Sequence, residues 1–291
     1  MSKENQKLKF KNQNLRIRPL ALLSVIVIAL LILSAISAPL IAPFSYDAQD
    51  TANILKTPDS THIMGTDKLG RDIFSRILYG SQISLSVGII ATLVAMIIGV
   101  LYGAISGYKG GAIDNYMMRI VDIIYALPDI MVIILITIII GRGFLGIVLA
   151  ISIVNWVGIA RLMRGEVLKI KEQLFVESAK AVGAGHWRII LRHILPNTLG
   201  PLIVTMTFRI PAAILSESTL SFIGLGLAPP FSSWGVLAND GWAALRFYPH
   251  LLIFPAIIIF ITVLSFNILG DELKEAMDPQ LRKGIRIING A

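Results

Sequence analysis

The sequence contains no cysteine, which excludes disulfide bonds, thiolate nucleophiles and cysteine-ligated metals. Charge is also scarce, because only 15% of the 291 residues are Asp, Glu, Lys or Arg, whereas 55% are hydrophobic. A soluble domain of this size needs far more polar surface, so one large water-soluble core is excluded. Several apolar stretches reach the roughly 20 residues needed to cross a bilayer. These features predict a polytopic membrane protein.

Patterns that would indicate an enzyme are also missing. The four histidines show no H-E-x-x-H spacing, and no G-x-S-x-G stretch is present. GTDKLGRD (65–72) has the spacing of a phosphate-binding loop, yet Arg71 and Asp72 replace the Lys and the Ser or Thr that bind triphosphate and Mg²⁺. We predict no catalytic residue, cofactor or metal site, and any ATP must be handled by another chain. The charges of 65–72 are expected to tie the loop to itself or to a partner.

Six apolar stretches predict six transmembrane helices and an all-α fold. They cover residues 20–43, 83–108, 119–141, 144–161, 199–221 and 250–270. The first run follows a basic tail at 1–19 and is longer than a signal-peptide core, which favours an uncleaved span. The other predicted segments are an extracytoplasmic loop at 44–82, a core domain of five helices at 83–270 and a tail at 271–291.

The distribution of positive charge predicts the orientation. Most of the 26 Lys and Arg residues lie in the two tails and around 109–119 and 161–198, which share one side of the membrane if six spans are present. Cytoplasmic segments are enriched in Lys and Arg, so both termini and the segment 162–198 are expected inside. This asymmetry accounts for the net charge of +8 without a nucleic-acid partner.

The segment 162–198 is expected to form two short helices. Apolar residues recur at helical spacing in two stripes, the first at Met163, Val167, Ile170 and Leu174 and the second at Trp187, Ile190, Leu191, Ile194 and Leu195. Gly183 lies between them and permits a sharp bend, and Pro196 is expected to end the second helix before the next span. The pattern predicts a protruding elbow. A helix lying on lipid headgroups is the alternative that the basic composition allows.

The end of this segment resembles the E-A-A-x₃-G-x₉-I-x-L-P signature of ABC importer permeases. Ser178 replaces the second-position alanine, and His193 stands where isoleucine is usual. In that family the signature forms a coupling helix that docks on the ATP-hydrolysing subunit. The resemblance implies this role for the matching positions and their neighbour, namely Glu177, Ser178, Ala179, Gly183, Leu195 and Pro196.

The stretches 62–88, 220–235 and 266–282 resemble the dipeptide and oligopeptide permeases of the OppC/DppC kind. This resemblance implies a type I ABC importer permease in a bacterial inner membrane. It also implies a homologous permease partner, two ATP-binding subunits and an extracytoplasmic substrate-binding protein. Short peptides are the expected substrate, and nickel or a metal–metallophore complex remains an alternative. In the loop 222–249, Trp234 and Trp242 are candidates either for binding-protein contacts or for anchors at the membrane surface.

Ionisable residues within the predicted spans are candidates for a translocation path or a subunit contact, because such groups are costly in lipid. These are Asp129, Arg209 and Glu217. Arg209 and Glu217 are separated by about 12 Å of helical rise, so we expect each to pair with another helix. Pro128 should kink the third span. Placement of Glu217 at a helix end, and coupling of transport to an ion gradient through acidic residues, remain alternatives.

Overall fold

The computed structural model describes residues 19–277, which form helices and loops without a β-strand. The basic tail up to residue 18 and residues 278–291 of the C-terminal tail lie outside the described residues. The longer helices are α2 (Pro19–Ile41), α3 (Ile73–Lys109), α4 (Gly111–Tyr125), α5 (Asp129–Ile140), α6 (Phe144–Ile170), α9 (Leu195–Phe222) and α11 (His250–Met277). Shorter elements are η1 (Thr51–Asn53), α7 (Leu174–Ala181), α8 (His186–Ile189), the π-helical turn η2 (Ile190–Ile194) and α10 (Trp234–Trp242). The predicted all-α class is confirmed.

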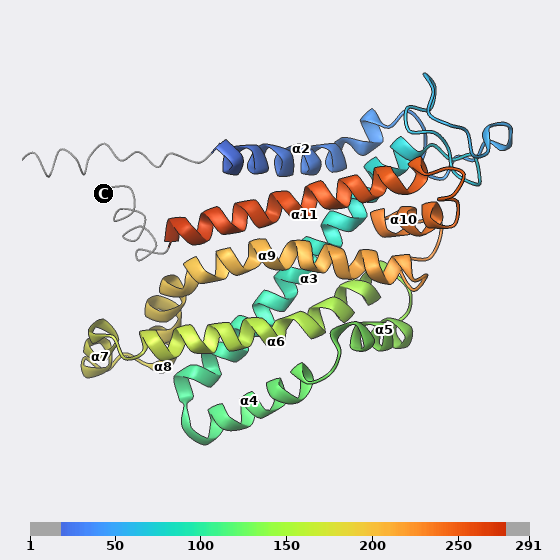
Figure 1. Ribbon diagram of the computed structural model, residues 1–291. Coiled ribbons are helices and arrows are strands. Elements are labelled where there is room, and N and C mark those ends of the chain that lie inside the picture. Colours follow the sequence, from blue (N-terminus) through green and yellow to red (C-terminus); the bar gives the residue numbers. More distant parts are fainter. Residues whose placement is uncertain (1–18, 278–291) are drawn as a thin grey trace, which may run out of the picture.

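Within residues 19–277, five helices are long and apolar enough to cross a membrane. They are α2, α3, α6, the continuous helix His186–Phe222 and α11. The bent pair α4 and α5 supplies a sixth span if the two are counted together. The described ends Pro19 and Met277 lie at the same end of the bundle as α7, and α10 lies at the opposite end (Figure 1).

Two spans are longer than the sequence predicted. α3 begins ten residues before position 83, because Asp72 caps its first turn by accepting a hydrogen bond from the Ser75 amide. α6 continues to Ile170, so the first apolar stripe belongs mostly to this span and not to a separate helix. Met163 and Val167 are fully buried within the bundle. Burial of this stripe explains why the helix does not stop at the predicted boundary.

The third span is broken, where the sequence predicted one kinked helix. α4 starts at Gly111, eight residues before the predicted start of this span at 119, and α5 follows at an angle of 87°. Pro128 caps α5, and the residue before a proline is disfavoured in the α conformation, so the helix stops before it. α5 extends over about 18 Å, which is too short to cross a bilayer alone.

The prediction that Pro196 ends a helix is wrong. The chain is helical from His186 through Phe222, and Pro196 lies in the first turn of α9. Proline lacks an amide donor and its ring clashes with the carbonyl four residues earlier. The preceding π-turn accommodates this clash, since the Leu195 amide donates to the Ile190 carbonyl five residues back.

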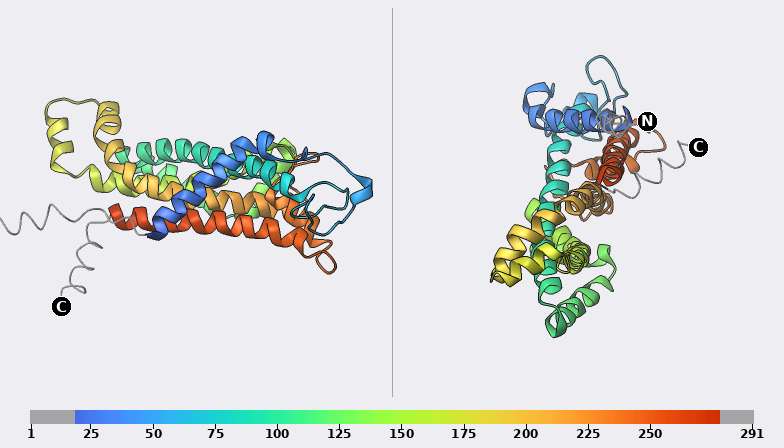
Figure 2. Two further views of the ribbon diagram at one scale, coloured as in Figure 1. Left: turned by 90° about the horizontal axis from the view of Figure 1, so that it is seen from above. Right: turned by 90° about the vertical axis from the view of Figure 1, so that its left-hand side faces the viewer.

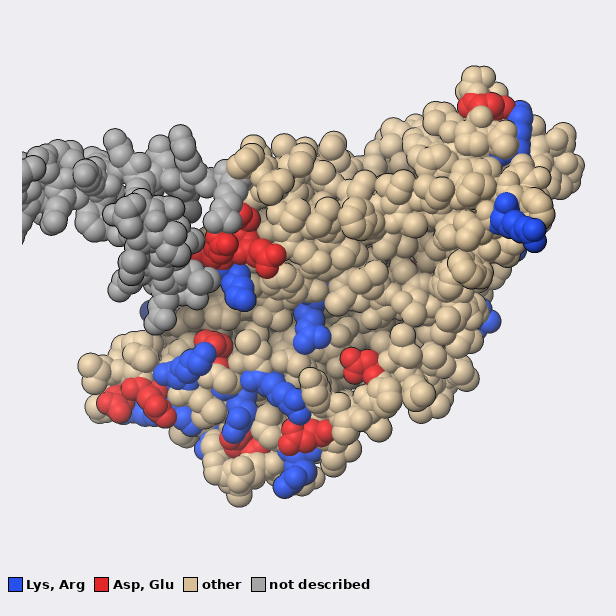
Figure 3. Space-filling model, viewed as in Figure 1, with Lys and Arg blue, Asp and Glu red and all other residues tan. Residues whose placement is uncertain are grey.

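Charged side chains lie mainly at the two ends of the bundle. Figure 3 shows Lys, Arg, Asp and Glu gathered at the end that carries α7 and at the opposite end, whereas the surface over the middle of α2 and α11 shows uncharged residues. An apolar belt between two polar ends is what a membrane-spanning bundle requires.

Candidate functional site

The residues of the EAA-like signature form a protruding elbow. α7 carries the first part of the signature and projects beyond the ends of the bundle helices (Figure 2). The chain then reverses at Gly183, which has a φ of +82°, a left-handed conformation that glycine adopts without strain. The bend at Gly183 is therefore built as the sequence predicted.

The buried face of the elbow attaches it to the bundle. Val176 on α7 is fully buried, and Ile189 and Ile194 on the returning helix are almost fully buried. All three belong to the apolar cluster that also contains Met163 and Val167 of α6. The elbow is thus packed against the end of α6.

The opposite face of the elbow is open. Glu177 and Ser178 are exposed, whereas Ala179 faces inward. Large apolar side chains surround them on the surface, among them Leu174 at 79% and Val182 at 85% exposure. Surface apolar groups gathered at one projecting feature are typical of an interaction site.

The second half of the signature lies apart from the first. Leu195 and Pro196 start α9, beyond the π-turn, and Leu195 packs against the same apolar cluster as Val176. A hollow of about 540 Å³ lies between α7 and the returning helix, lined in part by Ser178, Arg188 and His193. Ser178, Ala179 and Gly183 of the signature line this concave surface, whereas Leu195 and Pro196 do not.

The half-buried Arg209 and the exposed Asp129 line one small cavity between α4, α5, α6 and α9. The cavity has a volume of about 40 Å³, and Asn155 and Gly158 of α6 contribute to it. Arg209 Nη1 donates to Asn155 Oδ1 over 3.4 Å, so Arg209 pairs with another helix as predicted. A side chain at Gly158 would overlap the guanidinium group. Asp129 lies at the N-terminus of α5, where the helix dipole favours a carboxylate, and no ion pair joins it to Arg209.

Glu217 is fully buried, so its placement at an exposed helix end is wrong. The Ser221 hydroxyl lies 2.7 Å from Oε1, and the Ser84 hydroxyl of α3 lies 3.3 Å from Oε2. Ser84 in turn accepts the Trp234 amide at the start of α10. Through these hydrogen bonds Glu217 links α9, α3 and α10.

Trp234 serves neither of the roles proposed for it. Its side chain is fully buried, and the indole N–H donates to the Ile77 carbonyl over 3.3 Å. Trp242 is exposed and contacts Phe222 edge to face. Of the two tryptophans, Trp242 alone is placed to meet lipid or a partner.

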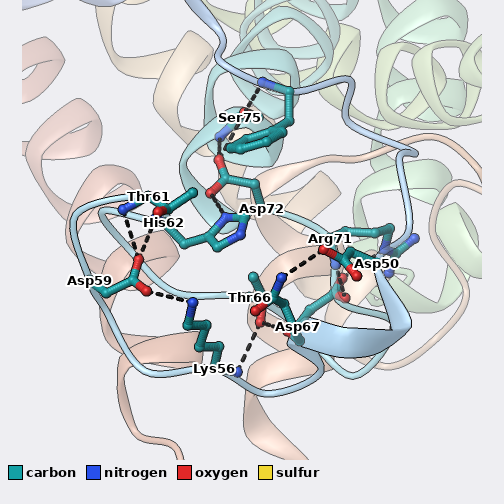
Figure 4. Close-up of polar contacts among 12 residues, drawn as sticks. Asp50, Lys56, Asp59, Thr61, His62, Thr66, Asp67, Arg71, Asp72 and Ser75 are labelled. Atoms are coloured by element: carbon teal, nitrogen blue, oxygen red, sulfur yellow. Dashed lines mark hydrogen bonds and ion pairs between the residues drawn. The ribbon is translucent and has the colours of Figure 1, made fainter.

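The stretch 65–72 precedes α3 at the end of the bundle opposite the elbow (Figure 1). It forms a buried ionic cluster, part of which Figure 4 shows. Asp67 pairs with Arg71 at 2.7 Å and with Arg76 of α3 at 2.5 Å. Arg76 also lies 3.3 Å from Asp240 of α10. These contacts connect the loop both to itself and to α10. The Asp67 carboxylate is paired with two arginine side chains of the same chain.

Two further carboxylates hold the same loop. Asp72 accepts from the Ser75 amide, and His62 Nδ1 lies 2.9 Å from its other oxygen. Hydrogen bonds from Lys56 and from the His62 amide lower the pKa of Asp59 to about 2. Hydrogen bonds and ion pairs among its own residues therefore hold this loop in its conformation (Figure 4).

The sequence reasoning missed the ion pairs of Arg76 with Asp240 and of Arg164 with Asp114. Their partners lie far apart in the chain and share no local pattern. Within residues 19–277, no three His, Asp or Glu side chains converge as metal ligands would.

Comparison with known proteins identifies the family. Residues 99–283 match the binding-protein-dependent transport system inner membrane component family. The chain belongs to this family. Residues 13–58 also match the N-terminal transmembrane domain of oligopeptide transport permease C.

Curated relatives are similar over almost the whole chain. The oligopeptide transport system permease protein OppC of Bacillus subtilis is 43% identical over 276 residues, covering 94% of this chain and 90% of the relative. The dipeptide transport system permease protein DppC of the same organism is 45% identical and covers 93% and 85%. The glutathione transport system permease protein GsiD of Pectobacterium atrosepticum is 42% identical and covers 88% and 85%.

The fold is that of solved ABC importer permeases. A chain of the inward-facing MetNI methionine ABC transporter aligns with a TM-score of 0.59 at 18% identity, covering 71% of this chain and 98% of that one. The type I permease fold predicted from the sequence is confirmed. The protein is a multi-pass inner-membrane permease subunit of an ABC importer.

Proposed function

We propose that this permease imports short peptides and receives the force of ATP hydrolysis through its elbow. The observation that carries the proposal is the projecting α7–Gly183 bend, which presents Glu177 and Ser178 within an exposed apolar surface. Such a surface suits a groove on an ATP-binding subunit, because buried apolar contact together with a few polar groups gives a specific interface.

The substrate class follows from the relatives. Those described above are permeases for oligopeptides, dipeptides and glutathione, which share a peptide backbone. This common chemistry favours short peptides over nickel or a metallophore. An extracytoplasmic binding protein delivers the peptide, in keeping with the name of the family.

The elbow faces the cytoplasm in this proposal. Support comes from the arrangement of the described chain, in which Pro19, Met277 and α7 share one end of the bundle (Figure 1). Lys and Arg are concentrated in the segments at this end, as the positive-inside rule requires of cytoplasmic segments. ATP is available to a partner on that side.

The chain forms half of the translocation path, and a homologous permease supplies the other half. The cavity between α5, α6 and α9 supports this role, because the exposed Asp129 and the half-buried Asn155 and Arg209 place polar groups together between apolar helices. Intramembrane polar groups of this kind commonly line a path for polar substrates. Two ATP-binding subunits, one for each elbow, complete the transporter.

Reconstitution tests the proposal. The permease is placed in vesicles with its partner permease, two ATP-binding subunits and the binding protein, and uptake of a labelled tripeptide is measured with and without ATP. Uptake should require ATP, and Glu177→Lys should abolish it while the complex remains assembled. Glu172→Lys makes the same charge change at an exposed residue outside the signature and should retain uptake. Normal uptake by Glu177→Lys, or ion-driven uptake by the chain alone, would refute the proposal.

A further inference from the structure

An ion pair with a buried carboxylate joins α4 to α6 close to the elbow, and its arginine side chain is 33% exposed. Arg164 Nε and Nη2 donate to the two oxygens of Asp114, each over 2.6 Å. Asp114 is 6% exposed and also accepts from the Ser106 hydroxyl of α3 over 2.5 Å. A bidentate Arg–carboxylate pair restricts direction as well as distance, so α4 is held in one orientation on α6.

Close packing joins α6 to α3 beside this ion pair. Gly99, Gly103 and Gly107 of α3 face α6, and a Cβ at Gly107 would lie 2.9 Å from the Arg164 carbonyl oxygen. Small residues at this spacing let two helix backbones approach closely. The Lys171 ammonium group, which follows α6, donates to the Gly107 carbonyl over 3.0 Å.

The elbow is fastened to the same helices. The buried Val176 of α7 shares an apolar cluster with Val167 of α6 and Val121 of α4. His186 Nδ1, at the start of the returning helix, lies 3.2 Å from the Tyr108 hydroxyl of α3. A displacement of α7 must therefore displace the ends of α3 and α6 with it.

We infer that Asp114 and Arg164 are positioning residues that transmit movement of the elbow to the broken span α4–α5. The inference rests on the proposed function, since it assigns a route to the force that the elbow receives. α4 leads through the bend at Pro128 directly to Asp129, which lines the polar cavity with Arg209. Movement of α4 therefore changes the polar cavity that the proposed path includes.

A second ion pair between the same two helices provides a matched control. Arg161 Nη2 lies 2.6 Å from Asp122 Oδ1, but the two side chains are 36% and 55% exposed. An exposed pair is solvated and contributes little to holding two helices together. The two arginines are similarly exposed, so the pairs differ in their carboxylates and in the number of hydrogen bonds. The bidentate pair with the buried Asp114 carboxylate, and not the pair with the exposed Asp122, is expected to determine whether α4 follows α6.

The transport test compares Arg164→Met, the charge exchange Asp114→Arg with Arg164→Asp, and the control Arg161→Met in the complete transporter. Peptide imported per ATP hydrolysed should fall about tenfold in Arg164→Met, a typical size for coupling between contacting residues. The charge exchange should recover most of this loss, and Arg161→Met should resemble the unmodified protein. An unchanged ratio in Arg164→Met overturns the inference, and so does an equal loss in Arg161→Met.

Spin-label distances separate this inference from the proposed function. Labels at Tyr116 on α4 and Val182 on the elbow occupy exposed positions, as does a label at Leu20 on α2. In the unmodified protein, addition of ATP should change the Val182–Leu20 distance and leave the Tyr116–Val182 distance constant. In Arg164→Met, addition of ATP should change both distances. A Tyr116–Val182 distance that already varies in the unmodified protein overturns the role assigned to Asp114 and Arg164 and leaves the proposed function standing. A Val182–Leu20 distance that does not change on addition of ATP overturns both the proposed function and this inference.

Discussion

Arg76 and Asp67 form an ion pair with a nitrogen-to-oxygen distance of 2.5 Å, and both side chains are almost completely buried. The pair connects the first turns of α3 to the loop that precedes it. Because Arg76 also contacts Asp240, one guanidinium group links this loop to α10. The end of the bundle opposite the elbow is thereby held together by charge as well as by apolar packing.

Arg76→Met should destabilise the protein by about 3 kcal/mol, because it leaves buried carboxylates with too few cations. The expected measurement is a lower thermal unfolding midpoint in detergent. Lys68→Met is the matched control, since Lys68 pairs with the same Asp240 but is 60% exposed. Its midpoint should hardly change. Equal effects of the two substitutions would contradict the assignment of stability to the buried pair.

Gly103→Ala should destabilise the α3–α6 contact by roughly 1–3 kcal/mol, because the added methyl group overpacks a close interface. The new Cβ would overlap the Ala160 carbonyl oxygen and lie 2.9 Å from Met163 Cβ. Gly165→Ala, on α6 with nothing within 4 Å of the added carbon, is the control. That substitution should be neutral or stabilise the helix by up to about 1 kcal/mol. Thermal unfolding of the two variants in the same detergent decides between these outcomes.

Most of the fold could be predicted from the sequence because apolar length is a local property. Uninterrupted runs such as 250–270 are visible without any tertiary information, and α11 covers this range. Boundaries were less predictable. The end of α6 depends on the burial of Met163 and Val167 against other helices, which the spacing of those residues does not reveal. A proline such as Pro128 predicts a bend, but its 87° angle depends on what α4 and α5 pack against.

The same distinction holds for the functional residues. Gly183 could be placed at a bend because its conformation is a local requirement. Pairing of Asp114 with Arg164 joins positions 50 residues apart and becomes visible only in the folded chain. The burial of Trp234 similarly depends on α3, which supplies the Ile77 carbonyl that its indole binds.

Gly183→Ala should impair coupling without disturbing any tertiary contact. The position has a φ of +82° and nothing within 4 Å of an added Cβ, so the cost is confined to the backbone and amounts to about 1–2 kcal/mol. Gly183→Pro should abolish transport, because proline cannot adopt this φ and removes the amide that donates to the Lys180 carbonyl. Gly185→Ala is the control, since Gly185 has a φ of −69° and equally open surroundings. Peptide uptake per ATP should fall in both Gly183 variants and stay normal in the control, and a loss in all three would contradict the account.

Site-specific photocrosslinking from Val182 tests the docking of the elbow most directly. Val182 is 85% exposed beside Gly183. Phe247 is 77% exposed in the connection between α10 and α11 and serves as the comparison position, since α10 lies at the end of the bundle opposite the elbow. In whole cells, a crosslinker at Val182 should capture the ATP-binding subunit, and one at Phe247 should not. Capture of that subunit from Phe247 alone, or labelling of Val182 by a membrane-impermeant reagent added outside the cell, would contradict the account.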